Sequence, residues 1–162
     1  MADSTVADST RWLDADEMAA WRGYIDTLAP LHHRFEADLA EFGLTVGDYE
    51  VLVWLSEVDE HQLRMCDLAA QLRITPSGLT RRLDGLVRNG LVRRQASADD
   101  KRVMMAVLTE RGHELLVRAA PSHLDSVRRH FIDLLSQHEV AALGSAFAKV
   151  RAALAAGQDA CS

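Results

Sequence analysis

The sequence predicts a mainly α-helical fold with one small β-hairpin, an α+β arrangement with helices before and after the hairpin. Apolar residues recur every three or four positions over most of the 162-residue chain, which is the helical period. The segments 91–95 and 103–108 instead alternate with period two around a polar connection, which is typical of a hairpin. Basic residues are concentrated in the middle third of the chain, where the hairpin falls.

Composition indicates one folded domain that needs no covalent or metal support. Hydrophobic residues make up 48% of the chain and charged residues 26%, which excludes a wholly disordered chain. No apolar run approaches the roughly 18 residues of a membrane span, and the polar, acidic start is unlike a signal peptide. Cys66 and Cys161 lie far apart and form no C-x-x-C pair. We therefore expect a reduced, cytoplasmic protein without a membrane partner.

Charge is distributed unevenly along the chain. The net charge is −6, yet nine of the 18 basic residues and only four of the 24 acidic residues lie between Arg64 and Arg102. This stretch carries +5 and the remainder −11. Such a basic segment indicates a surface for an anionic partner such as nucleic acid, or a solvated arginine-rich face. Charge alone does not separate the two interpretations.

The first third predicts two helices of different character. After a loose tail over 1–11, an amphipathic helix runs from Trp12 to Gly43, with a kink or a break at Pro30. A second helix begins at Thr45, where Asp48 completes a capping box. Because the second helix is apolar almost all round, we expect it at the centre of the domain.

Two short helices follow, and the second carries polar side chains on its outer face. The first spans Met65–Leu72; the second starts at Thr75-Pro76, an N-cap followed by proline, and ends at Asn89-Gly90. This arrangement is typical of a helix-turn-helix. The hairpin after it, with a charged tip over 96–102, makes the fold a winged helix-turn-helix.

Two further helices are predicted at the C-terminal end, one from Thr109 through Pro121 and one over about 136–155. The first helix and these two flank the basic middle and carry apolar stripes. They form a dimer interface, or they pack on their own domain. We therefore expect five segments: a flexible tail 1–11, a helical dimerisation region made of 12–44 and 109–156, a winged helix-turn-helix DNA-binding region 45–108, and a frayed tail 157–162.

Four segments in a fixed order carry a family resemblance. They are Gly43-Leu44-Thr45 with Tyr49, Val51, Leu52 and Leu55; Asp67-Leu68-Ala69 with Ile74–Leu86; Asn89–Arg94; and Asp100 and Arg102 followed by Leu108-Thr109. Together they resemble the MarR family of bacterial winged helix-turn-helix regulators. The resemblance implies a homodimer that binds a pseudo-palindromic double-stranded DNA operator, most often as a repressor. It further implies release by a small aromatic acid, an oxidant or a metal, and it implies neither a cofactor nor a catalytic residue.

The resemblance also assigns candidate DNA contacts. Residues at the start of the recognition helix are expected at the major groove, with Arg81 hydrogen-bonding a guanine and Arg82 binding a phosphate. Arg102 is expected in the minor groove and Asp100 as the brace of the wing. Of the alternating Arg93 and Arg94, only one should face the DNA backbone. The candidates are Thr75, Pro76, Ser77, Thr80, Arg81, Arg82, Arg94, Asp100 and Arg102, each of which is otherwise an ordinary solvated residue.

Candidate effector residues are Tyr24, His32, Trp54 and Arg64, which are otherwise core or interface residues. A zinc sensor using His123 and His130, or a redox sensor using Cys66, are alternatives of the same fold. No G-x-S-x-G, P-loop, dinucleotide or H-E-x-x-H motif is present, so we expect no enzyme. A helical protein-interaction module without DNA binding stays open as a different functional class.

Overall fold

The computed structural model describes residues 10–156. Of the expected tail 1–11, residues 1–9 lie outside the described residues, as does the expected tail 157–162 with Cys161. The elements in chain order are α1 (Ala15–Ala40), α2 (Val46–Ser56), the 3-10 turn η1 (Asp59–His61), β1 (Gln62–Arg64), α3 (Met65–Gln71), α4 (Pro76–Arg88), β2 (Val92–Ala96), β3 (Met104–Leu108), α5 (Glu110–His130), the 3-10 turn η2 (Ile132–Leu134) and α6 (Gln137–Ala156). This order confirms the predicted mainly α fold with a small β element.

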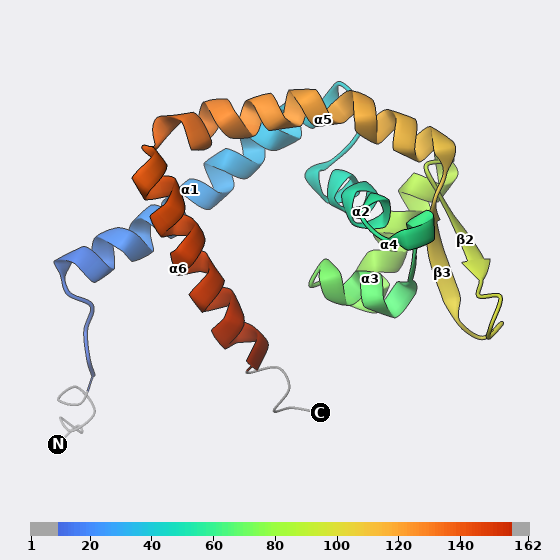
Figure 1. The fold of residues 1–162 in the computed structure, drawn as a ribbon, viewed down its shortest axis with the longest axis horizontal. Coiled ribbons are helices and arrows are strands. Elements are labelled where there is room, and N and C mark those ends of the chain that lie inside the picture. Colours follow the sequence, from blue (N-terminus) through green and yellow to red (C-terminus); the bar gives the residue numbers. More distant parts are fainter. Residues whose placement is uncertain (1–9, 157–162) are drawn as a thin grey trace, which may run out of the picture.

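The elements form a lobe suspended from one long helix. Figure 1 shows α5 running across the molecule, with α2, α3, α4 and the strands gathered below its first half. Helix α1 lies alongside the second half of α5, and α6 descends from its far end. Between residues 10 and 156, no helix is both long and apolar enough to cross a membrane. We call α2, α3, α4 and the three strands the lobe, and we call α1, α5, η2 and α6 the helical frame.

The sheet has three antiparallel strands in the order β1-β3-β2. Ala106 of β3 pairs with Leu63 of β1 on one side and with Arg94 of β2 on the other. The hairpin β2–β3 was predicted, whereas β1 was not. A strand of three residues is too short to show period two, and it follows Glu60 and His61, which both have positive φ angles. Pairing with β3 therefore defines β1.

The core of the lobe is built from leucines of three helices. Leu52 and Leu55 of α2, Leu68 of α3, and Leu79 and Leu83 of α4 are all completely buried. The expectation that the second helix occupies the centre of the domain is confirmed. Truncation of any one of these leucines to alanine is expected to cost about 2–5 kcal/mol.

Side-chain caps set the starts of the helices as the sequence predicted. The Thr45 hydroxyl accepts from the Asp48 amide at 3.0 Å, and the Asp48 carboxylate accepts from the Thr45 amide at 3.1 Å. Helix α1 runs through Pro30 as one helix, which agrees with the expected single long helix and not with its alternative, a break into two helices. A break at Pro30 is therefore wrong. Proline removes one backbone bond, and the packing of α1 along α5 keeps the helix continuous.

One carbonyl group joins the end of α4 to the start of α5. The Leu91 carbonyl oxygen accepts from the Thr109 amide at 3.1 Å and lies 3.0 Å from the Thr109 hydroxyl. The same hydroxyl lies 2.7 Å from the Gly90 carbonyl oxygen and accepts from the Gly112 amide. A Cβ added to Gly112 would overlap the Leu91 carbonyl oxygen. The long helix therefore begins in direct contact with the segment that ends α4, and we call this contact the Leu91 junction.

The Leu91 junction predicts opposite effects for two glycine substitutions. Gly112→Ala forces a methyl group against a backbone oxygen and is expected to lower the free energy of unfolding by about 1–3 kcal/mol. Gly85 lies inside α4, and a methyl group added there meets no neighbouring atom within 4 Å. Gly85→Ala is therefore expected to raise the free energy of unfolding by about 1 kcal/mol. Urea unfolding of both variants at one protein concentration measures the difference. Equal stabilities would contradict the role of the Leu91 junction.

Candidate nucleic-acid interface

The start of α4 presents an exposed, capped helix N-terminus. The Thr75 hydroxyl accepts from the Gly78 amide at 3.1 Å and lies 3.2 Å from the Ser77 hydroxyl. Thr75, Pro76 and Ser77 are all exposed. Proline at the first helical position has no amide to leave unpaired, and the remaining free amides and the helix dipole favour an anion. The geometry therefore suits a phosphate at this end of α4.

Arg81 lies on the exposed face of α4, one turn beyond Ser77. Within residues 10–156 its guanidinium makes no ion pair and no hydrogen bond. It borders a shallow cavity of about 470 Å³ together with Thr45 and Asp48 at the start of α2. The neighbouring Thr80 hydroxyl donates to the Pro76 carbonyl at 3.0 Å, which occupies its proton within the helix. Arg81 thus has a charge and donors that no described residue uses.

Arg82 points into the lobe instead. Its Nη1 lies 3.4 Å from the Gly47 carbonyl oxygen and 3.9 Å from a carboxylate oxygen of Glu50, both on α2. A Cβ at Gly47 would overlap the guanidinium, so glycine makes this approach possible. Arg82 is half-buried and links α4 to α2. The sequence analysis did not foresee this link, because it depends on the packing of two helices 35 positions apart.

Arg94 performs a similar role between the sheet and α4. Its Nη2 donates to the Thr80 carbonyl at 2.7 Å and lies 2.8 Å from the Asp84 carboxylate. The adjacent Arg93 is exposed and donates to the Gln95 side chain at 3.2 Å. Of this alternating pair, Arg94 faces α4 and Arg93 faces solvent. The Arg94 ion pair therefore fixes the wing relative to the recognition helix.

The tip of the wing is an ordered turn. The Asp100 carboxylate accepts from the Arg102 amide at 2.9 Å, and the Asp100 carbonyl accepts from the Val103 amide at 2.9 Å. Ser97 closes the turn through a 2.8 Å bond from its amide to the Val103 carbonyl. The Arg102 side chain is exposed, and within residues 10–156 it has no hydrogen-bond or ion-pair partner. In Figure 1 the turn that joins β2 to β3 projects away from α5.

The four effector candidates do not form one site. Tyr24 lies on α1 with its ring 6.1 Å from that of Phe147 on α6, and 45% of its surface is exposed. His32 pairs with Glu36 on the same helix at 3.3 Å. Arg64 is exposed between β1 and α3. Only Trp54 borders a cavity between α1, α2 and α5.

This cavity of about 270 Å³ is aromatic and contains His123, which the sequence analysis considered as a zinc ligand and not as part of an effector site. His123 lies 5.3 Å from the ring of Phe35 and 4.6 Å from that of Tyr49, measured between ring centroids. Burial lowers the pKa of His123, against the opposing effect of the Asp38 and Glu50 carboxylates. Burial also raises the pKa of Tyr49. We call this space the Trp54 cavity.

Metal and redox candidates were also located. Among residues 10–156, no three His, Cys, Asp or Glu side chains are placed together to hold a metal ion. His123 borders the Trp54 cavity, whereas His130 borders a separate cavity with Pro30 and Phe131. Cys66 is an exposed free thiol, and its Sγ lies 3.5 Å from the Asp67 carboxylate. The two histidines proposed as ligands are therefore not brought to one site.

Comparisons with known proteins agree with this fold. The sequence model described as the MarR family matches residues 44–104, which span α2 to the start of β3. The HTH-type transcriptional repressor YetL from Bacillus subtilis is 28% identical over 141 residues, which cover 85% of this chain and 84% of YetL.

Two solved structures from Streptomyces coelicolor are similar over almost their whole length. AbsC, a MarR family transcriptional regulator, has 41% identity and a TM-score of 0.85, with 91% of this chain and 99% of AbsC covered. Sco3205, a MarR family transcriptional regulator in complex with DNA, has 37% identity and a TM-score of 0.82, with 88% and 90% covered. The relatives are regulators and not enzymes. The chain belongs to the MarR family of transcriptional regulators.

Proposed function

We propose that the protein is a homodimeric, sequence-specific DNA-binding repressor that a small effector such as an aromatic acid releases from a pseudo-palindromic operator. The DNA-binding part of this proposal depends on two arginines whose guanidinium groups have no partner among residues 10–156. Arg81 on the recognition helix and Arg102 at the wing tip are exposed and without partners among residues 10–156. A helix in the major groove and a wing arginine in the minor groove together account for both positions.

The other candidate residues divide into two roles in this proposal. Thr75, Pro76 and Ser77 at the N-terminus of α4 contact phosphate, and Arg81 contacts the guanine edge. Arg82 and Arg94, together with Thr80 and Asp100, hold the recognition helix and the wing in position. The exposed parts of the Arg82 and Arg94 side chains add positive charge near the phosphates. The relative Sco3205, solved in complex with DNA, supports DNA binding as the function.

The apolar surface of the helical frame supports the homodimer. Trp21 and Leu28 of α1 are 51% and 49% exposed, and Val150 and Leu154 of α6 are 56% and 64% exposed. Leu134 in η2 is 73% exposed. Large apolar side chains exposed on α1, η2 and α6 in this number favour an interaction site. A two-fold contact through α1, η2 and α6 would cover it and place two recognition helices for two half-sites of an operator.

An operator is first obtained by selecting bound fragments from random duplex DNA. A pseudo-palindromic consensus with a steep loss of affinity at rising salt concentration supports the proposal. Selection of no sequence, with binding that does not depend on salt, would instead favour the protein-interaction module. The predictions below use that operator.

The recognition helix predicts different defects for two adjacent arginines. Arg81→Ala should lose about 1–3 kcal/mol of binding free energy and relax the preference at one base position in each half-site. Arg82→Ala should weaken all sequences alike, because it loosens α4 on α2 and removes a charge near phosphate. Repeating the DNA selection with both variants measures the specificity. Identical profiles would contradict this division of roles.

The wing predicts an effect that depends on operator flanks. If Arg102 enters the minor groove, Arg102→Ala should weaken binding more on A·T-rich flanks than on G·C-rich flanks, because a narrow groove concentrates negative potential. Asp100→Ala should give a milder form of the same loss, since it frees the turn and retains the arginine. Gel-shift affinities on paired operators at one salt concentration test this. An equal loss on both operators would make Arg102 a simple phosphate contact.

The interface predicts that a single charge on α6 separates the dimer. Val150→Glu should yield monomer in analytical ultracentrifugation and weaken operator binding at least tenfold, because a carboxylate would be buried in an apolar contact. Ala152→Glu adds the same charge on the opposite face of α6 and serves as the matched control. A dimeric Val150→Glu variant with normal operator affinity would place the interface elsewhere.

A further inference from the structure

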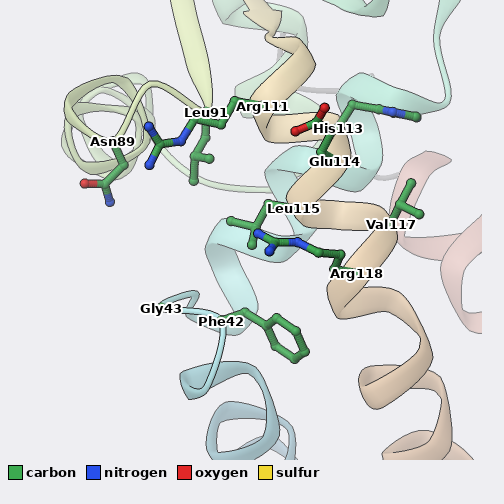
Figure 2. A pocket seen from close by; sticks show the side chains of 10 residues that line it. All are labelled: Phe42, Gly43, Asn89, Leu91, Arg111, His113, Glu114, Leu115, Val117 and Arg118. Carbon is green, nitrogen blue, oxygen red and sulfur yellow. The ribbon is translucent and has the colours of Figure 1, made fainter.

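A second groove lies on the face of α5 at the junction between the lobe and the helical frame. It encloses about 960 Å³, against about 270 Å³ in the Trp54 cavity. Figure 2 shows its wall, formed by the first half of α5, by Phe42 and Gly43 from the α1–α2 turn, and by Asn89 and Leu91 after α4. A volume near the upper end of the range for small-molecule sites is sufficient for an elongated ligand. We call this space the α5 groove.

The α5 groove combines an apolar floor with two unpaired positive charges. Leu91, Leu115 and Phe42 contribute apolar surface, and Leu91 is buried. Arg111 and Arg118 are seven residues apart on α5, about 10 Å along the helix axis, so they lie on one face. Within residues 10–156 neither guanidinium makes an ion pair or hydrogen bond. The remaining charged or titratable wall residues are Glu114 and His113, so arginines predominate.

The Trp54 cavity has the opposite charge. Glu50 borders it, the Asp38 carboxylate acts on the pKa of His123 there, and no lysine or arginine lines it. A carboxylate placed in that cavity would lie near the Asp38 and Glu50 carboxylates, and the Arg82 guanidinium, 3.9 Å from Glu50, is already engaged by Glu50. An acidic effector is therefore electrostatically mismatched to the Trp54 cavity and matched to the α5 groove.

We infer that the α5 groove is the binding site for an elongated amphipathic carboxylate, whose charged group pairs with Arg111 or Arg118 and whose apolar body covers Leu115 and Phe42. This inference rests on the proposed function for its regulatory meaning, but the binding step stands independently. It assigns the acidic effector to a site that none of the four candidates from the sequence belongs to.

The position of the α5 groove gives ligand binding a route to the recognition helix. Asn89 caps the C-terminal end of α4, and Leu91 supplies the carbonyl of the Leu91 junction. Gly43, with φ of 69°, forms the turn between α1 and α2. A ligand in the groove contacts the end of α4, Leu91, the α1–α2 turn and α5. Its affinity therefore changes when the lobe moves relative to the helical frame. Occupancy therefore shifts the spacing of the two recognition helices in a dimer.

Decanoate is the probe, titrated into the full chain in isothermal calorimetry, with decanamide as the uncharged control. We expect decanoate to bind at least tenfold more tightly than decanamide, and Arg111→Gln and Arg118→Gln each to remove most of that difference. Arg88→Gln is the matched control, because Arg88 is exposed and adjacent to Asn89 but outside the groove wall. His123→Gln tests the Trp54 cavity and is expected to leave the affinity for decanoate unchanged.

Several results would overturn the inference. They are equal affinities for decanoate and decanamide, unchanged affinity in both arginine variants, or loss of affinity in His123→Gln alone. In gel shifts, saturating decanoate should lower operator affinity about tenfold in the parent and Arg88→Gln, but not in Arg111→Gln. If Arg111→Gln weakens operator binding without decanoate and reduces its salt dependence, Arg111 is a phosphate contact and the inference fails. Decanoate binding by a protein that selects no operator would refute the proposed function and leave the groove as a ligand site.

Discussion

The Leu91 carbonyl is the constraint on which the arrangement of the whole molecule depends. It accepts hydrogen bonds from the Thr109 amide and the Thr109 hydroxyl. Because Gly112 has no side chain, the first turn of α5 can lie against this carbonyl oxygen. Helix α4 ends at Arg88, and Gly90, two residues later, has a φ of 70° that turns the chain into this contact. One small hydrogen-bonded contact thus connects the part of the lobe suited to DNA with the helix that spans the molecule. The start of α5 and the segment after α4 therefore share one set of hydrogen bonds.

The arginines of the basic stretch between Arg64 and Arg102 have two roles, and the degree of burial of each side chain indicates which role it has. Arg82 and Arg94 are half-buried and bonded to carbonyls and carboxylates of neighbouring elements, so they stabilise the geometry of the lobe. Arg81 and Arg102 are exposed, and within residues 10–156 they are unpaired. A guanidinium with five donors and no internal partner is best satisfied by phosphate or a base edge. The positive charge of this stretch is therefore partly structural.

Much of the fold could be predicted because its signals are local. Thr45, Thr75 and Thr109 each begin a helix through their own hydroxyl. The apolar residues on nearly all sides of α2, and the apolar stripe of α4, place both helices in the core. The errors arose where distant contacts decided the outcome. Strand β1 exists because β3 offers it a partner, and α1 continues through Pro30 because it packs along α5. Neither contact leaves a pattern within the segment that it stabilises.

The sequence by itself determined the class of fold, the family resemblance, and the identity of the exposed residues at the start of α4 and at the wing tip. These follow from capping, turn chemistry and periodicity, which act over a few residues. Only the tertiary structure decided which arginines are engaged inside the lobe, and that the four effector candidates lie apart. It alone brought Arg111 and Arg118 beside Phe42 and Leu91, and His123 beside Tyr49. Cavities and ion pairs join side chains far apart in the chain, so their existence depends on packing that no single segment encodes.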